Sequence, residues 1–496
     1  MPRNTHYIDG RFVEDRTSDR IAVYNPATAE QIAEIPDGPA EIVDAAVDAA
    51  RKAQLAWSEL PPIERAGYVK AIAEKIRGKV DVLAETISRE QGKILSLARG
   101  EVLGMAGLMD YMAEWARRIE GEIIASDRKG ETIYLNRVPI GVVAGILPWN
   151  FPFYLIGRKL APALVAGNTI VIKPSEETPL NAFLFAELAD EVGLPKGVFN
   201  MVSGRGRTTG ATLSGHPGID LVSFTGSVPT GVAIMEAAAK NLTRVNLELG
   251  GKAPAIVLKD ADLDLAVEAI TASRVINTGQ VCNCAERIFV ERQVADEFTE
   301  RFVKRMAAVT YGDPIAERTV DMGPLVNAVQ LDKVEAMVDR AREAGASVVL
   351  GGKRAERNRG HHYEPTVLTG CTPDMEIMRK EIFGPVAPVA VVEDADEAVH
   401  YANDTEYGLT SSLYTQDLNK AMRVTRRLQF GETYINRENG EAYQGFHAGR
   451  KKSGIGGADG KHGFYEYMET QAVYIQHGWG GNDGPAVPGQ KGMICT

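Results

Sequence analysis

The sequence predicts an α/β protein whose N-terminal half forms a doubly wound parallel sheet. Short apolar runs alternate with helical stretches in this half of the chain. The runs cover residues 141–147, 169–173, 198–202 and 221–224, and the helical stretches include 180–191 and 231–239. Strands and helices that alternate at this spacing are typical of parallel sheets that bind dinucleotides. The composition agrees, because 496 residues with 44% hydrophobic and 24% charged side chains can bury a large core in two or three domains.

The charge and hydropathy of the chain exclude several classes of function. A net charge of −11 argues against nucleic-acid binding, which depends on a basic surface that follows the phosphates. It also disfavours a role at an anionic membrane surface. The first residues contain no apolar signal segment, and Pro148, Asn150 and Pro152 interrupt the most apolar later run before it could span a bilayer. We therefore expect a cytoplasmic protein without nucleic-acid or membrane partners.

The cysteines are few, and one of them is a candidate nucleophile. The chain has Cys282, Cys284, Cys371 and Cys495, which fits a reducing compartment. The first two are close in sequence, but they lack the further cysteines or histidines of a zinc site, so we expect no bound metal. Cys282 follows a glycine-containing turn. A thiol needs a low pKa or a partner base to attack near neutral pH, so other residues must activate it.

The part of the chain that precedes the predicted sheet is mainly helical, with strands at its two ends. Residues 7–30 are predicted to form a short strand-and-turn segment. In residues 63–83 apolar side chains recur every three or four positions, the period of one buried helix face. The helical pattern continues through 103–119, whose methionines and aromatics either pack in the core or line a substrate tunnel. Residues 121–138 alternate polar and β-branched side chains, which predicts a two-stranded hairpin.

Polar residues follow three of the predicted parallel strands, at the edge where such sheets bind ligands. Asn150 follows the first strand, Lys173 and Glu176 follow the second, and Gly226 and Ser227 follow the fourth. Gly226 and Ser227 open a helix, so their backbone amides could face a pyrophosphate; an ordinary turn is the alternative. Lys173 and Glu176 could bind ribose hydroxyls, and a carboxylate there would favour NAD by repelling the 2′-phosphate of NADP. A solvated turn explains this pair equally well.

Glu248 is a candidate general base. It lies between two leucines and precedes two glycines, so its carboxylate can be desolvated. Desolvation raises the pKa of a carboxyl group and suits it to take a proton near neutral pH. A strand and a helix at 261–276 separate Glu248 from Cys282, which is enough chain to fold the two residues together.

Six short motifs follow one another along the chain. They are Pro148-Trp149-Asn150-Phe151-Pro152, Lys173-Pro174-Ser175-Glu176, Phe224-Thr225-Gly226-Ser227, Glu248-Leu249-Gly250-Gly251-Lys252, Gly279-Gln280-Val281-Cys282 and Glu381-Ile382-Phe383-Gly384-Pro385. In this order they resemble the aldehyde dehydrogenase superfamily. The resemblance covers nearly the whole chain, from the Asn25-Pro26-Ala27-Thr28 opening to Lys452-Ser453-Gly454. One motif alone would be modest support, whereas all six in the family's order are strong support.

The resemblance implies a covalent mechanism in which Cys282 attacks the carbonyl carbon of an aldehyde. Asn150 matches the side-chain amide that, with the backbone N–H of Cys282, stabilises the oxyanion of the thiohemiacetal. Hydride transfer to NAD then leaves a thioester. Glu248 matches the base that activates water to release the carboxylic acid. Cys284 matches no role that this mechanism requires.

The resemblance also implies NAD as the cofactor. The predicted cofactor-binding residues are Trp149, Lys173, Ser175, Glu176, Gly226, Ser227, Leu249, Glu381 and Phe383. Among them, Lys173 and Glu176 match the ligands of the adenosine ribose, and Glu381 matches the ligand of the nicotinamide ribose. Gly226 and Ser227 match the pyrophosphate turn, and the phenylalanine matches a residue that packs near the nicotinamide.

The family's architecture implies three parts. A Rossmann-like NAD-binding domain comprises residues 1–120 and 140–250, and an α/β catalytic domain comprises 251–446, with strands near 288–290, 348–350 and 386–391. A small β oligomerisation element and the C-terminal tail comprise 121–139 and 464–496. In the family a final segment, here 464–476, lies alongside the hairpin and pairs with the sheet of a neighbouring subunit, so a homodimer or homotetramer is expected. The tail from residue 477 is rich in glycine and proline, which predicts an extended, solvated end; contact with a partner subunit is the alternative.

Four polar residues distinguish this chain from members of the family that take apolar aldehydes. They are Arg158, Asn283, Glu441 and His447, and such members tend to carry aromatics at the first, third and fourth positions. Polar groups in a desolvated tunnel cost free energy unless the substrate satisfies them, so these residues select a hydroxylated or anionic aldehyde. The set resembles the branch that oxidises lactaldehyde and glycolaldehyde. The four side chains would then hydrogen-bond the α-hydroxyl or nearby oxygens.

Several alternatives stay open. Arg158 and Glu441 could form a purely structural ion pair, or Arg158 could pair with the carboxylate of succinic semialdehyde or another short anionic aldehyde. A CoA-acylating semialdehyde dehydrogenase would pass the acyl group to coenzyme A, but Glu248 argues for water. A non-catalytic structural or binding member would have lost part of the catalytic set, whereas Cys282, Asn150 and Glu248 are all present.

Overall fold

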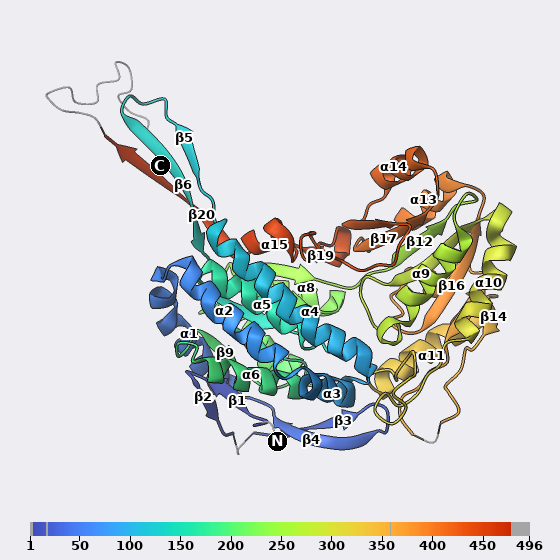
Figure 1. Ribbon diagram of the computed structural model, residues 1–496, viewed down its shortest axis with the longest axis horizontal. Coiled ribbons are helices and arrows are strands. Elements are labelled where there is room, and N and C mark those ends of the chain that lie inside the picture. The colour runs from blue at the N-terminus through green and yellow to red at the C-terminus, as the bar shows by residue number, and fades with distance from the viewer. Residues whose placement is uncertain (1–2, 16–17, 358, 478–496) are drawn as a thin grey trace.

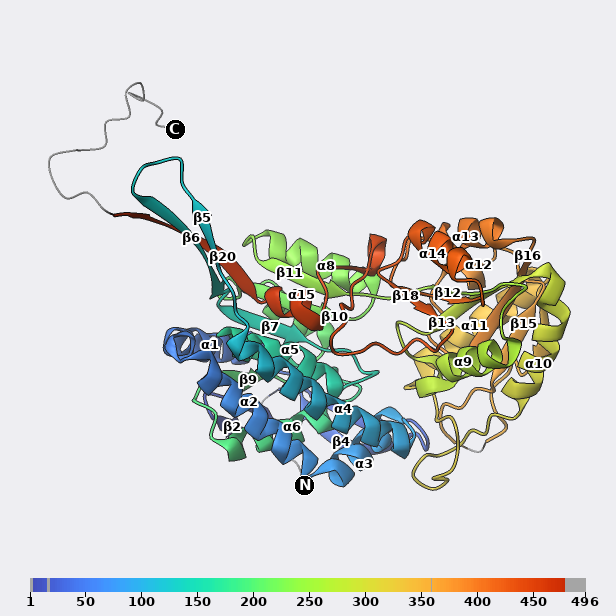
Figure 2. The same ribbon diagram turned by 45° about the horizontal axis from the view of Figure 1, so that its top comes forward.

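The structure is a computed structural model that describes residues 3–15, 18–357 and 359–477. It consists of two α/β lobes and a narrow β arm that projects away from both (Figure 1, Figure 2). The tail from residue 478 onward, including Cys495, lies outside the described residues, so the expectation of an extended tail stays a prediction. Within the described residues, no helix combines the length and the apolar character needed to cross a membrane.

The first lobe is built on a sheet with the strand order β19-β11-β10-β7-β8-β9-β1-β2. The strands from β11 to β9 run parallel, and the strands at both edges are antiparallel. The strands are β1 (His6–Ile8), β2 (Arg11–Val13), β7 (Val142–Ile146), β8 (Thr169–Lys173), β9 (Phe199–Met201), β10 (Leu221–Thr225), β11 (Arg244–Glu248) and β19 (Gly454–Ile455). Each predicted apolar run forms a strand, so the prediction of a parallel sheet in this half is confirmed.

Helices cover both faces of this sheet. Val143 of β7 packs in a core with α2, α4, α5 and α6, whereas Val142 and Ala144 pack in a second core with α1 and α8. Successive side chains of a strand point to opposite faces of the sheet, so burial of both sets shows that helices cover both faces. The sheet is therefore doubly wound. The helices are α1 (Ala40–Glu59), α2 (Pro62–Arg77), α3 (Val80–Gln91), α4 (Leu95–Ala113), α5 (Tyr154–Ala166), α6 (Leu180–Val192), α7 (Ala211–Ser214) and α8 (Val228–Ala239), with the short turns η1 (Glu114–Arg117) and η2 (Gly206–Gly210).

Two predictions for the N-terminal part need correction. The helix expected over residues 63–83 is interrupted, because Lys79 adopts a non-helical φ of −126° and ψ of 18° between α2 and α3. The apolar period runs on across this break since both helices bury one face against the same core, which the pattern alone could not distinguish from one helix. The helix expected to reach residue 119 ends at Ala113 and continues only as η1. The strand-and-turn segment forms β1, β2 and a separate antiparallel ribbon of β3 (Arg20–Asn25) and β4 (Glu30–Pro36).

The second lobe contains another α/β sheet, with the order β14-β15-β16-β13-β12-β17-β18. Its strands are parallel except β14, which is antiparallel to β15. The strands are β12 (Ala253–Val257), β13 (Ala285–Glu291), β14 (Ser347–Leu350), β15 (Thr366–Thr369), β16 (Val386–Val392), β17 (Thr410–Tyr414) and β18 (Glu432–Ile435). The helices are α9 (Leu263–Val275), α10 (Ala295–Ala307), α11 (Ala328–Glu343), α12 (Glu376–Arg379), α13 (Ala395–Asn403) and α14 (Leu418–Arg427), with the turns η3 (Ile276–Gly279) and η4 (Arg292–Val294). The strands expected near 288–290, 348–350 and 386–391 are confirmed as β13, β14 and β16.

After β18 the chain returns to the first lobe and then enters the arm. It passes through η5 (Lys451–Ser453), β19 at the edge of the first sheet, and α15 (Gly460–Tyr465), which lies over the first lobe in Figure 1. The arm consists of β5 (Glu122–Ala125), β6 (Glu131–Pro139) and β20 (Met468–Gln476), in the order β20-β6-β5. The predicted hairpin is therefore confirmed, and the final segment lies alongside it. The strand begins at Met468 rather than at Phe464, because Phe464 belongs to α15.

Candidate active site

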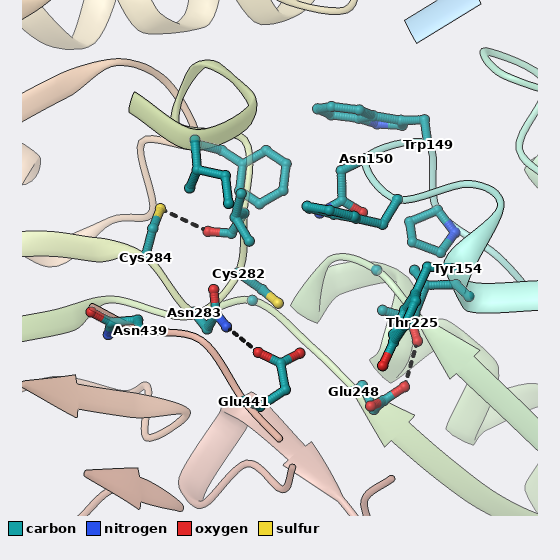
Figure 3. Close-up of a pocket in the computed structure, with 18 of the residues that line it drawn as sticks. Trp149, Asn150, Tyr154, Thr225, Glu248, Cys282, Asn283, Cys284, Asn439 and Glu441 are labelled. Atoms are coloured by element: carbon teal, nitrogen blue, oxygen red, sulfur yellow. Dashed lines mark hydrogen bonds between the residues drawn. The ribbon is translucent and has the colours of Figure 1, made fainter. Parts of the chain in front are cut away.

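A cavity of about 500 Å³ is lined by residues of both lobes. Every predicted site residue lines it except Lys173, Ser175, Glu176 and His447. The three predicted catalytic residues reach it from two different sheets: Asn150 follows β7, Glu248 ends β11, and Cys282 lies in the loop before β13. In Figure 3 the Cys282 sulfur points into the space between Asn150 and Glu248. The carboxyl ends of β7 and β11 and the loop before β13 thus bring together residues that are far apart in the chain.

A strained turn aims Cys282 at this cavity. Asn277 and Thr278 have φ values of 47° and 60°, a left-handed conformation that side chains rarely adopt, and Gly279 follows with φ 71°. The glycine is required there, because a Cβ would lie 2.2 Å from the carbonyl oxygen of Gly384. The Gln280 side chain donates to the Asn277 carbonyl at 3.0 Å and accepts from the Val326 N–H at 2.9 Å. These contacts hold the turn in its unfavourable conformation.

The Cys284 side chain points away from the Cys282 sulfur (Figure 3). Its thiol donates to the Val281 carbonyl at 2.9 Å, and its sulfur points to the opposite side of the loop from that of Cys282 (Figure 3). Burial raises the pKa of the Cys284 thiol to about 12. This thiol is therefore protonated and unreactive at neutral pH, although a few of its atoms contribute to the cavity wall.

Asn150 is held by buried polar groups. Its side-chain amide donates to the Gln280 carbonyl at 3.0 Å. Its own carbonyl accepts from Lys93 Nζ at 2.8 Å and from the Asn277 side chain at 3.0 Å. Lys93 forms a fully buried ion pair with Glu101, which also accepts from the N–H groups that follow Asn150 at the start of α5. The amide therefore keeps a fixed position next to the Cys282 loop.

The environment of Glu248 differs from the prediction. Its Oε2 accepts from the Thr225 hydroxyl at 2.7 Å and lies 3.4 Å from Lys159 Nζ, and its Oε1 lies 3.8 Å from an Arg158 nitrogen. Burial raises the pKa of the Glu248 carboxyl, but the cations Arg158 and Lys159 outweigh burial and lower the pKa to about 2. The expected raised pKa is therefore wrong. Oε1 is buried and has no hydrogen-bond partner among the described residues.

Arg158 is the centre of an ionic cluster. It lies on α5 with 5% of its side chain exposed, and both Nε and a terminal nitrogen donate to the Asp459 carboxylate. The same terminal nitrogen lies 3.5 Å from Glu441, which in turn accepts from the Asn283 amide at 2.7 Å (Figure 3). The ion pair of Arg158 with Glu441 therefore exists, but Asp459 is the closer partner.

His447 is buried and is not among the residues that line the cavity. Only 2% of its side chain is exposed, and its Nδ1 lies 2.6 Å from Glu432 Oε1. Burial and Arg158 both lower the pKa of His447, but Cys282 and Glu432 outweigh them and raise the pKa well above its usual range.

The residues predicted for the cofactor fall into two groups. Lys173 and Glu176 form an ion pair at 3.3 Å at the carboxyl end of β8, and Glu176 also accepts from the Gly206 N–H at 3.0 Å. Ser175 lies between them with 7% exposure. The second group lines the cavity: Ser227 caps the N-terminus of α8, Trp149 packs edge-on to Phe383, and Gly226, Leu249 and Glu381 surround them. Burial raises the pKa of the Glu381 carboxyl to about 7.

Sequence reasoning missed Lys159, Glu432 and Asp459. Lys159 carried a usable signal, because it follows Arg158 in an otherwise apolar helix, where two adjacent cations need buried anions. Asp459 stands in a glycine-rich turn and adopts a φ of 65°. The neighbouring glycines in the sequence indicate a turn at this position but give no sign of a buried ion pair. Glu432 begins β18 and shows no local pattern that separates it from a solvated carboxylate.

Comparisons with known proteins agree with this geometry. Residues 12–473 match the Aldehyde dehydrogenase family. The chain is 57% identical over 470 residues to lactaldehyde dehydrogenase of Escherichia coli (strain K12), covering 95% of this chain and 98% of that one. It is 43% identical over 478 residues to 3,6-anhydro-alpha-L-galactose dehydrogenase of Vibrio sp. (strain EJY3), covering 96% and 99% of the two chains.

Solved structures show the same similarity. The crystal structure of lactaldehyde dehydrogenase from Escherichia coli has a TM-score of 0.95 at 57% identity, with 96% of this chain and 99% of that chain covered. A structure of betaine aldehyde dehydrogenase from Staphylococcus aureus in complex with NAD+ has a TM-score of 0.93 at 36% identity, with 96% and 95% covered. The resemblance seen in the motifs is thus confirmed over almost the full length. The chain belongs to the aldehyde dehydrogenase family and is an enzyme that oxidises aldehydes.

Proposed function

We propose that this enzyme uses NAD to oxidise a short α-hydroxyaldehyde, such as lactaldehyde or glycolaldehyde, to the carboxylic acid. The observation that carries the proposal is the linked set of Arg158, Glu441 and Asn283 in the wall of the cavity that holds Cys282. An apolar aldehyde would leave these polar groups desolvated without a partner, whereas a hydroxyl can both donate to Glu441 and accept from Arg158 or Asn283. The 57% identity to a lactaldehyde dehydrogenase supports the same choice.

We assign the chemistry to three residues. The Cys282 sulfur attacks the carbonyl carbon, and the oxyanion of the thiohemiacetal accepts hydrogen bonds from the Asn150 amide and the Cys282 backbone N–H. Glu248 then takes a proton from the water that hydrolyses the thioester. Its pKa of about 2 makes it an anion throughout the physiological range, and we assign the water to its Oε1, which has no hydrogen-bond partner among the described residues. A base that is always ionised needs no prior deprotonation, although it is a weaker proton acceptor than a carboxylate with a raised pKa.

NAD fits the residues along the second part of the cavity. Bound NAD supplies the acceptor for the hydride that leaves the thiohemiacetal carbon. The N-terminus of α8, capped by Ser227, offers backbone amides to a pyrophosphate, and the Glu381 carboxylate can accept from ribose hydroxyls. Glu176, paired with Lys173, has a lowered pKa, so its negative charge would repel the 2′-phosphate of NADP. In this proposal the first lobe, residues 1–120 and 140–250, holds NAD, and residues 251–446 supply the nucleophile.

A short anionic aldehyde fits the cluster less well. The Arg158 nitrogens already face Asp459, Glu441 and Glu248, so a substrate carboxylate would enter beside carboxylates rather than beside a free cation. Coenzyme A as the acyl acceptor is disfavoured because an ionised Glu248 in the cavity wall supports water as the acceptor. A non-catalytic role is disfavoured because nucleophile, oxyanion donor and base line one cavity.

We also propose that the enzyme is a homo-oligomer assembled through the arm. Ile123 of β5 is 73% exposed and Tyr474 of β20 is 65% exposed, so the projecting sheet presents large apolar side chains to solvent. The outer edges of β5 and β20 pair with no other strand among the described residues. A neighbouring subunit that covers this arm would bury both features.

Initial rates over a panel of short aldehydes test the substrate assignment. With NAD, kcat/KM for lactaldehyde and glycolaldehyde should exceed that for propanal and for succinic semialdehyde by at least about tenfold, since one hydrogen bond to a charged group contributes about 1.5–3 kcal/mol. NADP should support much lower rates. A preference for propanal or for succinic semialdehyde would refute the proposal.

A further inference from the structure

We propose that Glu286 positions the nicotinamide end of the cofactor site: its buried carboxylate ties the segment that carries Glu381 and Phe383 to the turn that carries Cys282. Glu286 lies near the start of β13 with 1% of its side chain exposed, and it is not among the residues that line the cavity. It therefore acts through other residues and is a positioning residue rather than a catalytic one. The inference deepens the proposed function and rests on it, because Glu381 and Phe383 are assigned to NAD there.

The Glu286 carboxylate accepts hydrogen bonds from two backbone N–H groups of the cofactor segment. The Ile382 N–H donates to Oε2 at 2.9 Å, and the Phe383 N–H donates to Oε1 at 3.0 Å. Residues 381–383 belong to no helix or strand, so their N–H groups need an acceptor from elsewhere in the fold. Glu286 supplies that acceptor, and an ionised acceptor makes a stronger hydrogen bond than a neutral one.

Phe383 adopts a strained backbone conformation that needs such support. Its φ is 56°, in the left-handed region that side chains rarely adopt. Gln330 of α11 donates to the Ile382 carbonyl at 3.2 Å and to the Phe383 carbonyl at 2.7 Å. Glu286 and Gln330 together therefore bind both the N–H and the C=O groups of these two residues. This backbone conformation places the Phe383 ring edge-on to Trp149, with the ring centroids 5.3 Å apart, in the cavity wall.

Two buried cations bind the same carboxylate. Lys252 Nζ donates to Oε2 at 2.7 Å, and an Arg274 nitrogen lies 3.3 Å from Oε1. Burial raises the pKa of the Glu286 carboxyl, but Lys252 and Arg274 outweigh burial and lower the pKa to about 2, so the group is ionised at neutral pH. Arg274 also donates to the Gly279 carbonyl at 2.7 Å, in the turn that aims Cys282. The carboxylate thus connects the cofactor segment to the turn of the nucleophile through one arginine.

Lys252 belongs to a segment whose backbone also holds Glu381. The Gly251 N–H donates to the Glu381 carboxylate at 2.8 Å. A Cβ at Gly250 would lie 2.7 Å from Glu381 Oε2, so the close approach of the carboxylate requires a glycine there. Loss of the Glu286 carboxylate would release the cofactor segment on one side and leave Lys252 without its partner on the other, so Glu381 and Phe383 would lose their fixed positions.

Isothermal titration calorimetry with NAD and with ADP, in the absence of aldehyde, tests the inference. ADP shares the adenosine and the two phosphates of NAD but lacks the nicotinamide ribose, which is the group assigned to Glu381. Glu286→Asp keeps the charge and shortens the side chain by one methylene, whereas Glu286→Gln keeps the length and replaces one acceptor oxygen with an amide donor. We expect either variant to raise the Kd for NAD by about tenfold, the effect of losing one hydrogen bond to a charged group, and to change the Kd for ADP by less than about twofold.

Glu291→Gln is the matched control, because Glu291 stands at the other end of β13, is also buried and accepts from the Lys259 N–H at 2.8 Å. Both of its Kd values should equal those of the wild type. If the folded Glu286 variants bind NAD as tightly as the wild type, or if their binding of ADP weakens as much as their binding of NAD, the inference is wrong. Glu286→Asp keeps the charge that balances Lys252 and Arg274, so the test survives if the glutamine variant fails to fold. Since no aldehyde is present, the result is independent of whether the hydroxyaldehyde assignment is correct.

Discussion

Replacing Arg158 with leucine should remove most of the selectivity for a hydroxylated aldehyde. In the proposed complex the guanidinium donates to the α-hydroxyl, and a hydrogen bond to a charged group contributes about 1.5–3 kcal/mol. Since 1.4 kcal/mol corresponds to a factor of ten, the ratio of kcat/KM for glycolaldehyde to that for propanal should fall by about 10- to 100-fold. The ratio is the informative quantity, because any effect of the substitution on Glu248 changes the rates with both aldehydes equally.

The same substitution should destabilise the fold for a separate reason. Asp459 has 1% of its side chain exposed, and Arg158 is its ion-pair partner. Removing one member of a buried pair typically costs about 3–5 kcal/mol, because the remaining charge stays desolvated without compensation. The double substitution Arg158→Leu with Asp459→Asn also removes the remaining charge at Asp459, so it should recover much of the stability while the selectivity stays lost.

Urea unfolding and initial rates with the two aldehydes at saturating NAD separate these effects. Arg301→Leu, which removes an exposed arginine from α10, is a matched control that should change neither measurement. If the folded double variant loses rate equally with glycolaldehyde and propanal, Arg158 is only structural, and the argument for hydroxyl recognition is wrong.

Three further predictions concern the catalytic and cofactor residues. Cys282→Ser should abolish aldehyde oxidation, whereas Cys284→Ser should keep most of it because the Cys284 thiol is buried and faces away from the cavity; equal losses would point to the wrong nucleophile. Glu248→Gln should stall at the thioester, so a stopped-flow trace should show a burst of NADH with little steady-state turnover, and unimpaired turnover would exclude Glu248 as the base. Glu381, with its pKa raised to about 7 by burial, is protonated below that pH and can accept from ribose hydroxyls only when ionised. The Kd for NAD should therefore tighten by about tenfold between pH 6 and pH 8, and a fluorescence titration that shows the same pH dependence in Glu381→Gln would assign the effect to another group.

The sequence predicted those parts of the fold and of the site that depend on local patterns in the chain. The strands β7, β8, β9 and β10 are short apolar runs between helical segments. Such runs indicate strands that are buried inside a sheet. Cys282, Asn150 and Glu248 were found because each stands at the end of such a strand or in a turn, where its motif is contiguous in the chain. Residues of this kind can be predicted without knowing which distant parts of the chain they contact.

The properties that depend on distant contacts could not be predicted. Glu248 is flanked by leucines, so its neighbours in the chain indicated a raised pKa. The cations that lower it come from α5, and Lys159 lies 89 residues before it. Asp459 lies 301 residues from Arg158, and no pattern near either residue links them. The sign of a pKa shift in a buried cluster follows from which charges the fold assembles, and this information is not local.

The position of Arg158 would couple the proposed choice of substrate to the ionisation of Glu248, the proposed general base. Its guanidinium faces both Glu441 and Glu248, and it is one of three cations, with Lys159 and His447, that lower the pKa of Glu248. An aromatic side chain at this position would admit apolar aldehydes, but it would also withdraw one cation from a buried carboxylate and raise the pKa of Glu248. In our proposal, selectivity for a hydroxyaldehyde and the low pKa of the base therefore depend on the same residue. A change of substrate class at position 158 should alter the pH dependence of thioester hydrolysis together with the preference among aldehydes.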